Sequence, residues 1–134
     1  MLIRFADLRD FELIAARDNW IAADILKEKL SRGEVLAAFV GNRFAGWLRY
    51  GIFWDSIPFV NMLRVEEEMR GKGIGKALTL RFEKEMRSRG AKTVMTSSTQ
   101  NEYAQHFYLK LGYRAVGGFV PENEPYELLF AKEL

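Results

Sequence analysis

Residues 59–76 read FVNMLRVEEEMRGKGIGK and join an apolar segment, an acidic turn and a cluster of glycines. Residues 59–65 are predicted to form a strand, and the apolar spacing after the glycines predicts a long helix over about residues 73–89. Glycines between a strand and a helix let successive backbone N–H groups converge, because no Cβ blocks the approach. Unpaired N–H groups and the positive dipole end of the helix meet at the same place. The segment therefore predicts an anion-binding loop, to which three basic side chains add charge: Arg70, Lys72 and Lys76.

The predicted helix has one apolar stripe and one charged side. The stripe is expected to face the core and consists of Ile74, Ala77, Leu78, Phe82 and Met86. The charged residues are expected to face away from the core: Arg81, Glu83, Lys84, Glu85 and Arg87. Gly90 stands where a helix of this length is expected to end.

Two common phosphate-binding motifs fit the glycine cluster poorly. A Walker A loop requires serine or threonine after Gly-Lys, whereas Ala77 follows Gly75 and Lys76. A Rossmann pattern that begins at Gly71 requires glycine at position 76, where lysine stands. A nucleotide-binding protein that uses the same loop in another way stays open as an alternative.

The remaining elements alternate in an informative order. Strands are expected at residues 2–5, 34–40, 43–54, 93–97, 113–120 and 126–132. Further helices are expected after Asp7, over about residues 19–31 and from Asn101, with a break in the chain at residues 55–58. Hairpin strands followed by a β-α-β-α-β run predict an α/β (α+β) fold with a mixed sheet and helices on both faces. We expect one domain over residues 1–134.

Composition excludes several classes of protein. The chain has no cysteine and one histidine, which excludes disulfides, thiolate or multi-histidine metal sites and a cysteine nucleophile. A net charge of +2 argues against binding to nucleic acid, so an RNA- or DNA-binding adaptor is a weak alternative. No apolar run has the length of about 18–20 residues that a membrane span needs. We therefore expect a cytoplasmic protein that uses neither metal nor membrane.

Two sequence motifs together resemble those of one enzyme family. Arg70, Gly73 and Gly75 match the pattern [RQ]-x-x-G-x-[GA], which resembles the coenzyme-A loop of the GNAT N-acetyltransferases. The family pattern N-x-x-A-x-x-[FLY]-Y-x-x-x-G-[FY] is then filled by Asn101, Ala104, Phe107, Tyr108, Gly112 and Tyr113. The order of expected elements also resembles the GNAT fold over almost the whole chain. The resemblance implies a mostly antiparallel sheet of about six to seven strands, with a splayed central parallel pair and about four helices.

The resemblance implies acetyl-CoA as co-substrate and assigns residues to it. The backbone of Leu63, Arg64 and Val65 would pair with the pantetheine arm. The pyrophosphate would be held beside Arg70 by the N–H groups of Gly71, Lys72, Gly73, Ile74, Gly75 and Lys76. Asn101 would hydrogen-bond the pantetheine or a nearby water, although a role as a plain helix N-cap is equally compatible with the sequence.

The same resemblance places Tyr108 beside the thioester sulfur, where its phenol would protonate the leaving thiolate. The other interpretation of Tyr108 is a core residue with an exposed hydroxyl, because it lies in an apolar stripe. The implied mechanism is direct transfer, in which a neutral amine attacks the thioester carbonyl and a backbone N–H near residues 63–65 stabilises the oxyanion. The runner-up is a non-catalytic sensor or partner module that binds CoA.

The general base is not identified by the sequence. Phe59 and Thr96 stand where two branches of the family carry a glutamate. A water chain reached by Asn61, Thr96 or Glu66 is the remaining candidate. His106 is expected to be exposed, and residues 66–68 are expected to be a solvated acidic loop.

The amine acceptor is expected to be a small molecule, a peptide N-terminus or a lysine. By resemblance its pocket would draw on Asp18, Asn19, Trp20, Tyr50, Trp54, Asp55, Glu122 and Glu124. Aromatic rings together with carboxylates suit an amine or a cationic terminus. The tryptophans suit a core or a dimer face equally well, so a homodimer stays open.

Overall fold

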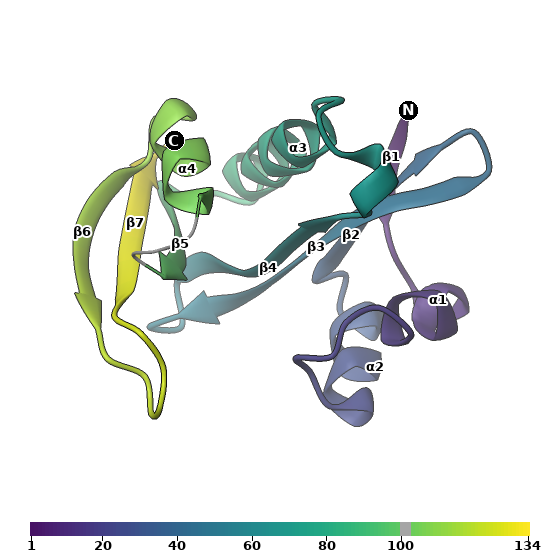
Figure 1. The fold of residues 1–134 in the computed structure, drawn as a ribbon, viewed down its shortest axis with the longest axis horizontal. Coiled ribbons are helices and arrows are strands. Elements are labelled where there is room, and N and C mark those ends of the chain that lie inside the picture. The colour runs from purple at the N-terminus through teal and green to yellow at the C-terminus, as the bar shows by residue number, and fades with distance from the viewer. Residues whose placement is uncertain (100–102) are drawn as a thin grey trace. The chain divides into compact units, whose positions relative to one another are not determined.

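A computed structural model describes residues 1–99 and 103–134 (Figure 1). The strands are β1 (Leu2–Phe5), β2 (Val35–Val40), β3 (Arg43–Phe53), β4 (Ile57–Val65), β5 (Thr93–Thr99), β6 (Arg114–Phe119) and β7 (Glu127–Glu133). The α-helices are α1 (Phe11–Ala15), α2 (Ala23–Ser31), α3 (Ile74–Ser88) and α4 (Ala104–Lys110), and short 3-10 turns occupy Leu8–Asp10 and Glu67–Met69. The expected element order is confirmed.

The strands form one seven-stranded sheet in the order β1-β2-β3-β4-β5-β7-β6. The pairs β1–β2, β2–β3, β5–β7 and β6–β7 are antiparallel, and β4–β5 is parallel. The α/β fold class with a mostly antiparallel sheet is therefore confirmed. The described pairing of β4 with β5 joins Phe59 to Met95 and Val60 to Thr96, which is short for strands of nine and seven residues.

The described residues group into two compact units. The first unit contains Met1–Tyr50 and Met62–Phe82, and the second contains Gly51–Asn61 and Glu83–Leu134. The expectation of a single domain over residues 1–134 stays a prediction.

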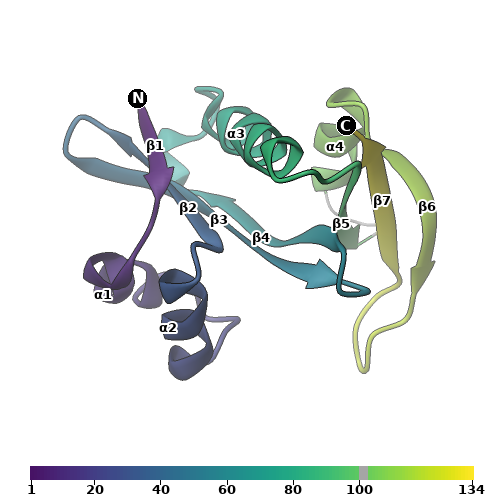
Figure 2. The ribbon, with the colours of Figure 1, turned by 180° about the vertical axis from the view of Figure 1, so that it is seen from behind.

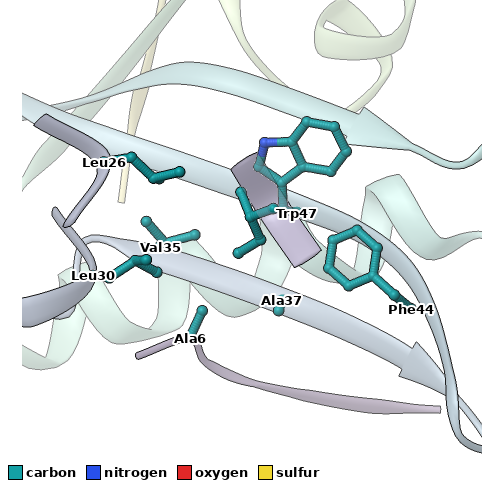
Figure 3. Packing of buried hydrophobic residues seen from close by; sticks show 8 residues of the cluster. Ala6, Leu26, Leu30, Val35, Ala37, Phe44 and Trp47 are labelled. Carbon is teal, nitrogen blue, oxygen red and sulfur yellow. The ribbon is translucent and has the colours of Figure 1, made fainter. Parts of the chain in front are cut away.

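The core of the first unit lies between the α1–α2 pair and the β2–β3 hairpin (Figure 3). Leu26 and Leu30 of α2 pack against Val35, Ala37 and Trp47 of the two strands. Burying each of the larger side chains stabilises the fold by about 1.5–3 kcal/mol. Because side chains alternate along a strand, Trp47 of β3 faces this cluster while its neighbours in the chain face α3.

The other face of β3 packs on α3. The ring of Tyr50 lies 5.3 Å from that of Phe82, centroid to centroid. A Cβ built on Gly46 would lie 3.5 Å from Leu78. The first part of α3 thus covers the face of β3 opposite α1 and α2.

Two of the predicted element limits were wrong. Residues 19–22 are not helical, because the Asp18 carboxylate accepts a hydrogen bond from the Trp20 N–H and holds a turn ahead of α2. The break expected at 55–58 is shorter, since Pro58 already belongs to β4 and is buried. The reversal is carried by Trp54 and Asp55, which both have positive φ angles, of 56° and 60°.

The second unit contains β5, β7 and β6 side by side (Figure 2). Helix α4 packs on this part of the sheet through Tyr108, whose ring lies 6.2 Å from that of Phe130 on β7. Contrary to expectation, Glu83 of α3 does not face away from the core and is only 3% exposed.

Candidate functional site

The glycine loop between β4 and α3 has the backbone conformation that glycine favours. Gly71 and Gly73 have φ angles of 77° and 80°, in the left-handed region. Met69, buried before the loop, and Ile74, buried at the first residue of α3, anchor its two ends. The Ala77 N–H donates to the Gly73 carbonyl and closes the first turn of the helix.

The loop presents donors and positive charge to solvent. In the first turn of α3, the N–H groups of residues 74–76 have no carbonyl four residues earlier within the helix. Arg70, Lys72 and Lys76 are exposed, and within the described part of the chain neither lysine forms an ion pair. The Arg70 Nε instead donates to the Val65 carbonyl at 3.1 Å. The loop can therefore bind an anion such as a diphosphate.

A close approach of β3 positions the strand that leads into the loop. A Cβ on Gly46 would lie 2.7 Å from the Arg64 carbonyl oxygen and 3.2 Å from the Val65 Cα, so only glycine fits without a shift. The Glu66 N–H donates to the Ala45 carbonyl at 2.8 Å. The Arg64 side chain turns to the Trp20 ring, 5.0 Å from its centroid. Leu63 and Val65 are half-buried.

Tyr108 is the third residue from the end of α4 in a tightly capped turn. The Tyr113 N–H donates to the Tyr108 carbonyl at 3.0 Å, and the Gly112 N–H donates to the Leu109 carbonyl at 3.1 Å. With Gly112 at φ 94°, these bonds make a Schellman cap. The ring of Tyr113 packs on that of Tyr108 at 5.4 Å. Glycine and tyrosine at 112 and 113 therefore have a direct structural task, which is to fix the end of the helix that carries Tyr108.

A partly buried ionic cluster that the sequence did not predict supports this turn. The Tyr113 hydroxyl donates to Glu83 Oε2 at 2.9 Å, and the Lys132 Nζ donates to Glu83 Oε1 at 2.9 Å. Burial, reinforced by the neighbouring carboxylate, raises the pKa of Tyr113 above its ordinary value. Tyr113 therefore stays protonated and acts as a hydrogen-bond donor.

Tyr108 itself is 5% exposed. Its ring also contacts Phe107 at 5.1 Å, so three aromatic neighbours hold it in place. Asn101, the other residue assigned from the second motif, lies outside the described residues.

The candidate bases have different surroundings. Thr96 is 1% exposed and its hydroxyl donates to the Val60 carbonyl at 3.1 Å, so it is a core residue. Glu66 is not freely solvated as expected, because it pairs with Arg17. Asn61 is exposed. His106 is exposed as expected, with its ring against that of Tyr103.

Two residues assigned to the acceptor site belong to the core of the first unit instead. Tyr50 is 2% exposed, and its hydroxyl donates to the Gly33 carbonyl. Asp18 is 3% exposed and accepts hydrogen bonds from Arg49 Nε at 2.7 Å and from Trp47 Nε1 at 3.0 Å. The other assigned residues are exposed: Asn19, Trp20, Trp54, Asp55, Glu122 and Glu124.

The second unit contains a pocket of about 570 Å³ that the sequence did not predict. Its lining comes from the end of β3 and from β4, β6 and β7: Ile52, Phe53, Phe59, Asn61, Phe119 and Leu129, with Gly51. Asn61 is the one polar side chain among these residues, and none of them is charged.

The described residues offer neither a metal site nor a membrane-spanning helix. They contain no group of three or more histidine or acidic side chains arranged to hold a metal ion. They also include no helix with the length and apolarity of a membrane span.

Solved structures that share the fold of this chain include acetyltransferases. Ard1 from Thermoplasma volcanium is 16% identical, with a TM-score of 0.83 over 99% of this chain and 97% of its own. The PaiA N-acetyltransferase from Thermoplasma acidophilum, solved with coenzyme A, is 18% identical, with a TM-score of 0.77 over 99% and 98%. An aminoglycoside 6'-acetyltransferase of type Ii is 25% identical, with a TM-score of 0.77 over 99% and 97%.

No curated protein matches the chain in sequence. The model of the acetyltransferase (GNAT) family, however, matches residues 4–113 of the 134. That match includes the glycine loop, the whole of α3 and α4, and the Gly112–Tyr113 cap. The chain therefore belongs to the acetyltransferase (GNAT) family.

Proposed function

We propose that this chain is an N-acetyltransferase that moves the acetyl group of acetyl-CoA directly to a primary amine. The observation that carries the proposal is the loop in which Gly71 and Gly73, both left-handed, lead into the N-terminus of α3. Glycine at these positions lets the loop adopt this conformation without strain, and the basic residues beside them suit a diphosphate. Two solved structures of similar fold contain coenzyme A, which supports coenzyme A as the source of that diphosphate.

Each contact with the co-substrate is proposed for a named group. The N–H groups of residues 71–76 hold the diphosphate, with Arg70 beside them. The backbone of residues 63–65 pairs with the pantetheine arm, for which Gly46 keeps the strand in place. Asn101 contributes a further hydrogen bond to the same arm. The thioester supplies an activated acetyl group. The protein therefore has to bind and orient the two substrates and to protonate the leaving thiolate.

The proposed acid is Tyr108. A thiolate with an ordinary pKa of about 8.5 leaves more easily when a donor protonates it, and a phenol is a suitable donor. The capped helix end and three neighbouring rings hold Tyr108 in a defined orientation, which favours a positioned acid over a mobile side chain. A backbone N–H near residues 63–65 would stabilise the oxyanion.

Phe59 and Thr96 stand at the two positions where two branches of the family carry a glutamate base, so neither position holds a carboxylate. We propose that the amine reaches the thioester in its neutral form, with a water held by Asn61 or Glu66 as the proton acceptor. The acceptor would be a primary amine of a small molecule, a peptide terminus or a lysine, and homodimer formation stays open.

Ligand-dependent melting and CoA release together test the proposal. Acetyl-CoA and CoA at about 100 times their dissociation constants should stabilise the chain by about 2.7 kcal/mol, whereas ATP and NAD should not. CoA release, followed with a thiol reagent, should then require both enzyme and amine. Stabilisation by acetyl-CoA without release across a broad panel of amines would instead favour a CoA-binding sensor or partner module. Stabilisation by ATP or NAD alone would overturn the assignment of the loop.

A further inference from the structure

The pocket of the second unit has a mostly apolar and aromatic lining. Three phenylalanines contribute to its walls, and two of them, Phe53 and Phe59, have ring centroids 6.2 Å apart. Phe53 is stacked on Trp54 at 5.3 Å, and Trp54 is 79% exposed at the tip of the hairpin. The aromatic surface thus continues from inside the pocket to its surroundings.

The pocket and Tyr108 lie on opposite faces of the sheet within this unit. Phe59 and Asn61 alternate with Val60 along β4, and Leu129 precedes Phe130 on β7. Phe59, Asn61 and Leu129 line the pocket, whereas Phe130 contacts the Tyr108 ring from the other face. The sheet therefore separates a group held in the pocket from the Tyr108 ring. Only the amine end of such an acceptor would extend to the thioester carbonyl, the one carbon that the nitrogen attacks and the sulfur leaves.

The chemistry of the lining disfavours a highly polar occupant. A hydroxyl or ammonium group moved from water to an apolar wall loses its hydrogen bonds unless the wall supplies new ones. Asn61 supplies one amide, and the lining has no carboxylate that would pair with an ammonium. An apolar group loses no hydrogen bonds and gains the transfer free energy of its buried surface.

We propose that this pocket binds the apolar part of the acceptor, so that the preferred substrates are primary amines that carry an alkyl chain or an aromatic ring. The inference rests on the proposed function and narrows it. Asn61, the exposed polar residue of the lining, accepts a hydrogen bond from the amine. The apolar wall disfavours the ammonium form, which favours the neutral nucleophile where no carboxylate base is present.

A homologous series of n-alkylamines tests the pocket, with CoA release as the readout. From propylamine to hexylamine, kcat/KM should rise about fourfold for each methylene that enters the pocket. Phenethylamine should exceed ethanolamine by about 100-fold, and putrescine and kanamycin should be poor acceptors. Tripeptides that begin with leucine or serine form a second arm, in which leucine should be preferred if the natural amine is a peptide terminus. A flat series, or a preference for the polar members of each pair, would overturn the inference.

A charge placed in the wall provides the matched variant. Phe119→Asp should lower kcat/KM for hexylamine by at least about tenfold and flatten the dependence on chain length. Val116→Asp is the control, because Val116 lies on the same strand, is 42% exposed against 49% for Phe119, and does not line the pocket. Phe119→Asn repeats the test without a charge, and melting temperatures show whether each variant folds. Equal effects of the variants at 116 and 119 would contradict the inference.

The failure of this inference differs from the failure of the proposed function. If the chain is not an acetyltransferase, no amine releases CoA in any arm. If only the inference is wrong, CoA is released but the polar amines are used as well as the apolar ones. Calorimetric titration of hexylamine and ethanolamine into the complex with CoA adds a reading that does not depend on turnover, in which hexylamine should bind about tenfold or more tightly.

Discussion

The hydroxyl of Tyr113 donates a 2.9 Å hydrogen bond to the carboxylate of Glu83, and both residues are buried. Tyr113 also provides the N–H that caps α4 at the Tyr108 carbonyl. The pair therefore connects the end of the helix that carries Tyr108 to the second half of α3. Lys132, whose side chain is 22% exposed, supplies the counter-charge.

Removing Glu83 should destabilise the protein strongly. Glu83→Ala leaves the Tyr113 hydroxyl and the Lys132 ammonium without their partner, and we expect the free energy of unfolding to fall by about 3 kcal/mol. Glu83→Gln should lower the free energy of unfolding by less, because its amide oxygen still accepts the hydrogen bond from the Tyr113 hydroxyl. Urea denaturation gives the values, and Lys84→Ala, exposed on the same helix, should stay within about 0.5 kcal/mol of the parent. A Glu83→Ala variant as stable as Lys84→Ala would show that the cluster contributes nothing.

Loss of the Tyr108 hydroxyl should affect turnover far more than binding. Tyr108→Phe keeps the ring contacts with Tyr113 and Phe130, so the fold should hold while kcat falls by about 100-fold. The dissociation constant of acetyl-CoA should change little. Tyr103→Phe is the matched control, since Tyr103 is 79% exposed. An unchanged kcat in Tyr108→Phe would remove the tyrosine from the proposed mechanism.

Local signals in the sequence predicted much of the fold. A helix is expected after Asp7, and Asp7 and Asp10 form a reciprocal capping box at the 3-10 turn Leu8–Asp10 that begins it. The long helix expected at 73–89 is α3, Ile74–Ser88, and Gly90 caps its end at φ 93°. In each case the residues that decide the structure are within a few positions of one another, so one window of sequence contains the whole interaction.

Contacts between distant residues could not be predicted in this way. Glu83 looked like a solvent-facing charge because its partners, Tyr113 and Lys132, are 30 and 49 positions away. Asp18 resembled an acceptor-site carboxylate for the same reason, as Arg49 is 31 positions away. The apolar pocket combines residues from four strands, and no single segment shows it.

The positive φ angle of Gly73 should matter for the co-substrate and not only for stability. Gly73→Ala places a Cβ in open space but at φ 80°, a strain of about 1–2 kcal/mol that favours a shift of the loop. Gly90→Ala is a matched control at the other end of α3, with φ 93° and equally open space. Both should lose similar stability in urea, whereas only Gly73→Ala should weaken acetyl-CoA binding, measured by calorimetry. Equal affinities in the two variants would contradict the proposed diphosphate site.

Asp18 and Arg49 form a second buried ion pair, and its loss should also be costly. The Asp18 side chain is fully buried and that of Arg49 is 7% exposed. Asp18→Asn removes the charge that neutralises the guanidinium, so we expect the free energy of unfolding at pH 7 to fall by about 3–5 kcal/mol. Asp24→Asn, exposed on α2, should change it by less than about 0.5 kcal/mol.

The Asp18–Arg49 pair also predicts how the stability of the protein changes with pH. Burial by itself raises the pKa of Asp18, but hydrogen bonds from Arg49 and Trp47 outweigh burial and hold that pKa below its ordinary value. Stability from Asp18 is therefore present above the unfolded pKa of about 3.9 and is lost as the pH falls through the lower native value. Urea midpoints between neutral pH and about pH 3 should fall less steeply for Asp18→Asn than for the parent, although Asp10, whose pKa is also lowered, leaves some dependence in both. Parallel curves would show that Asp18 is not the group that titrates.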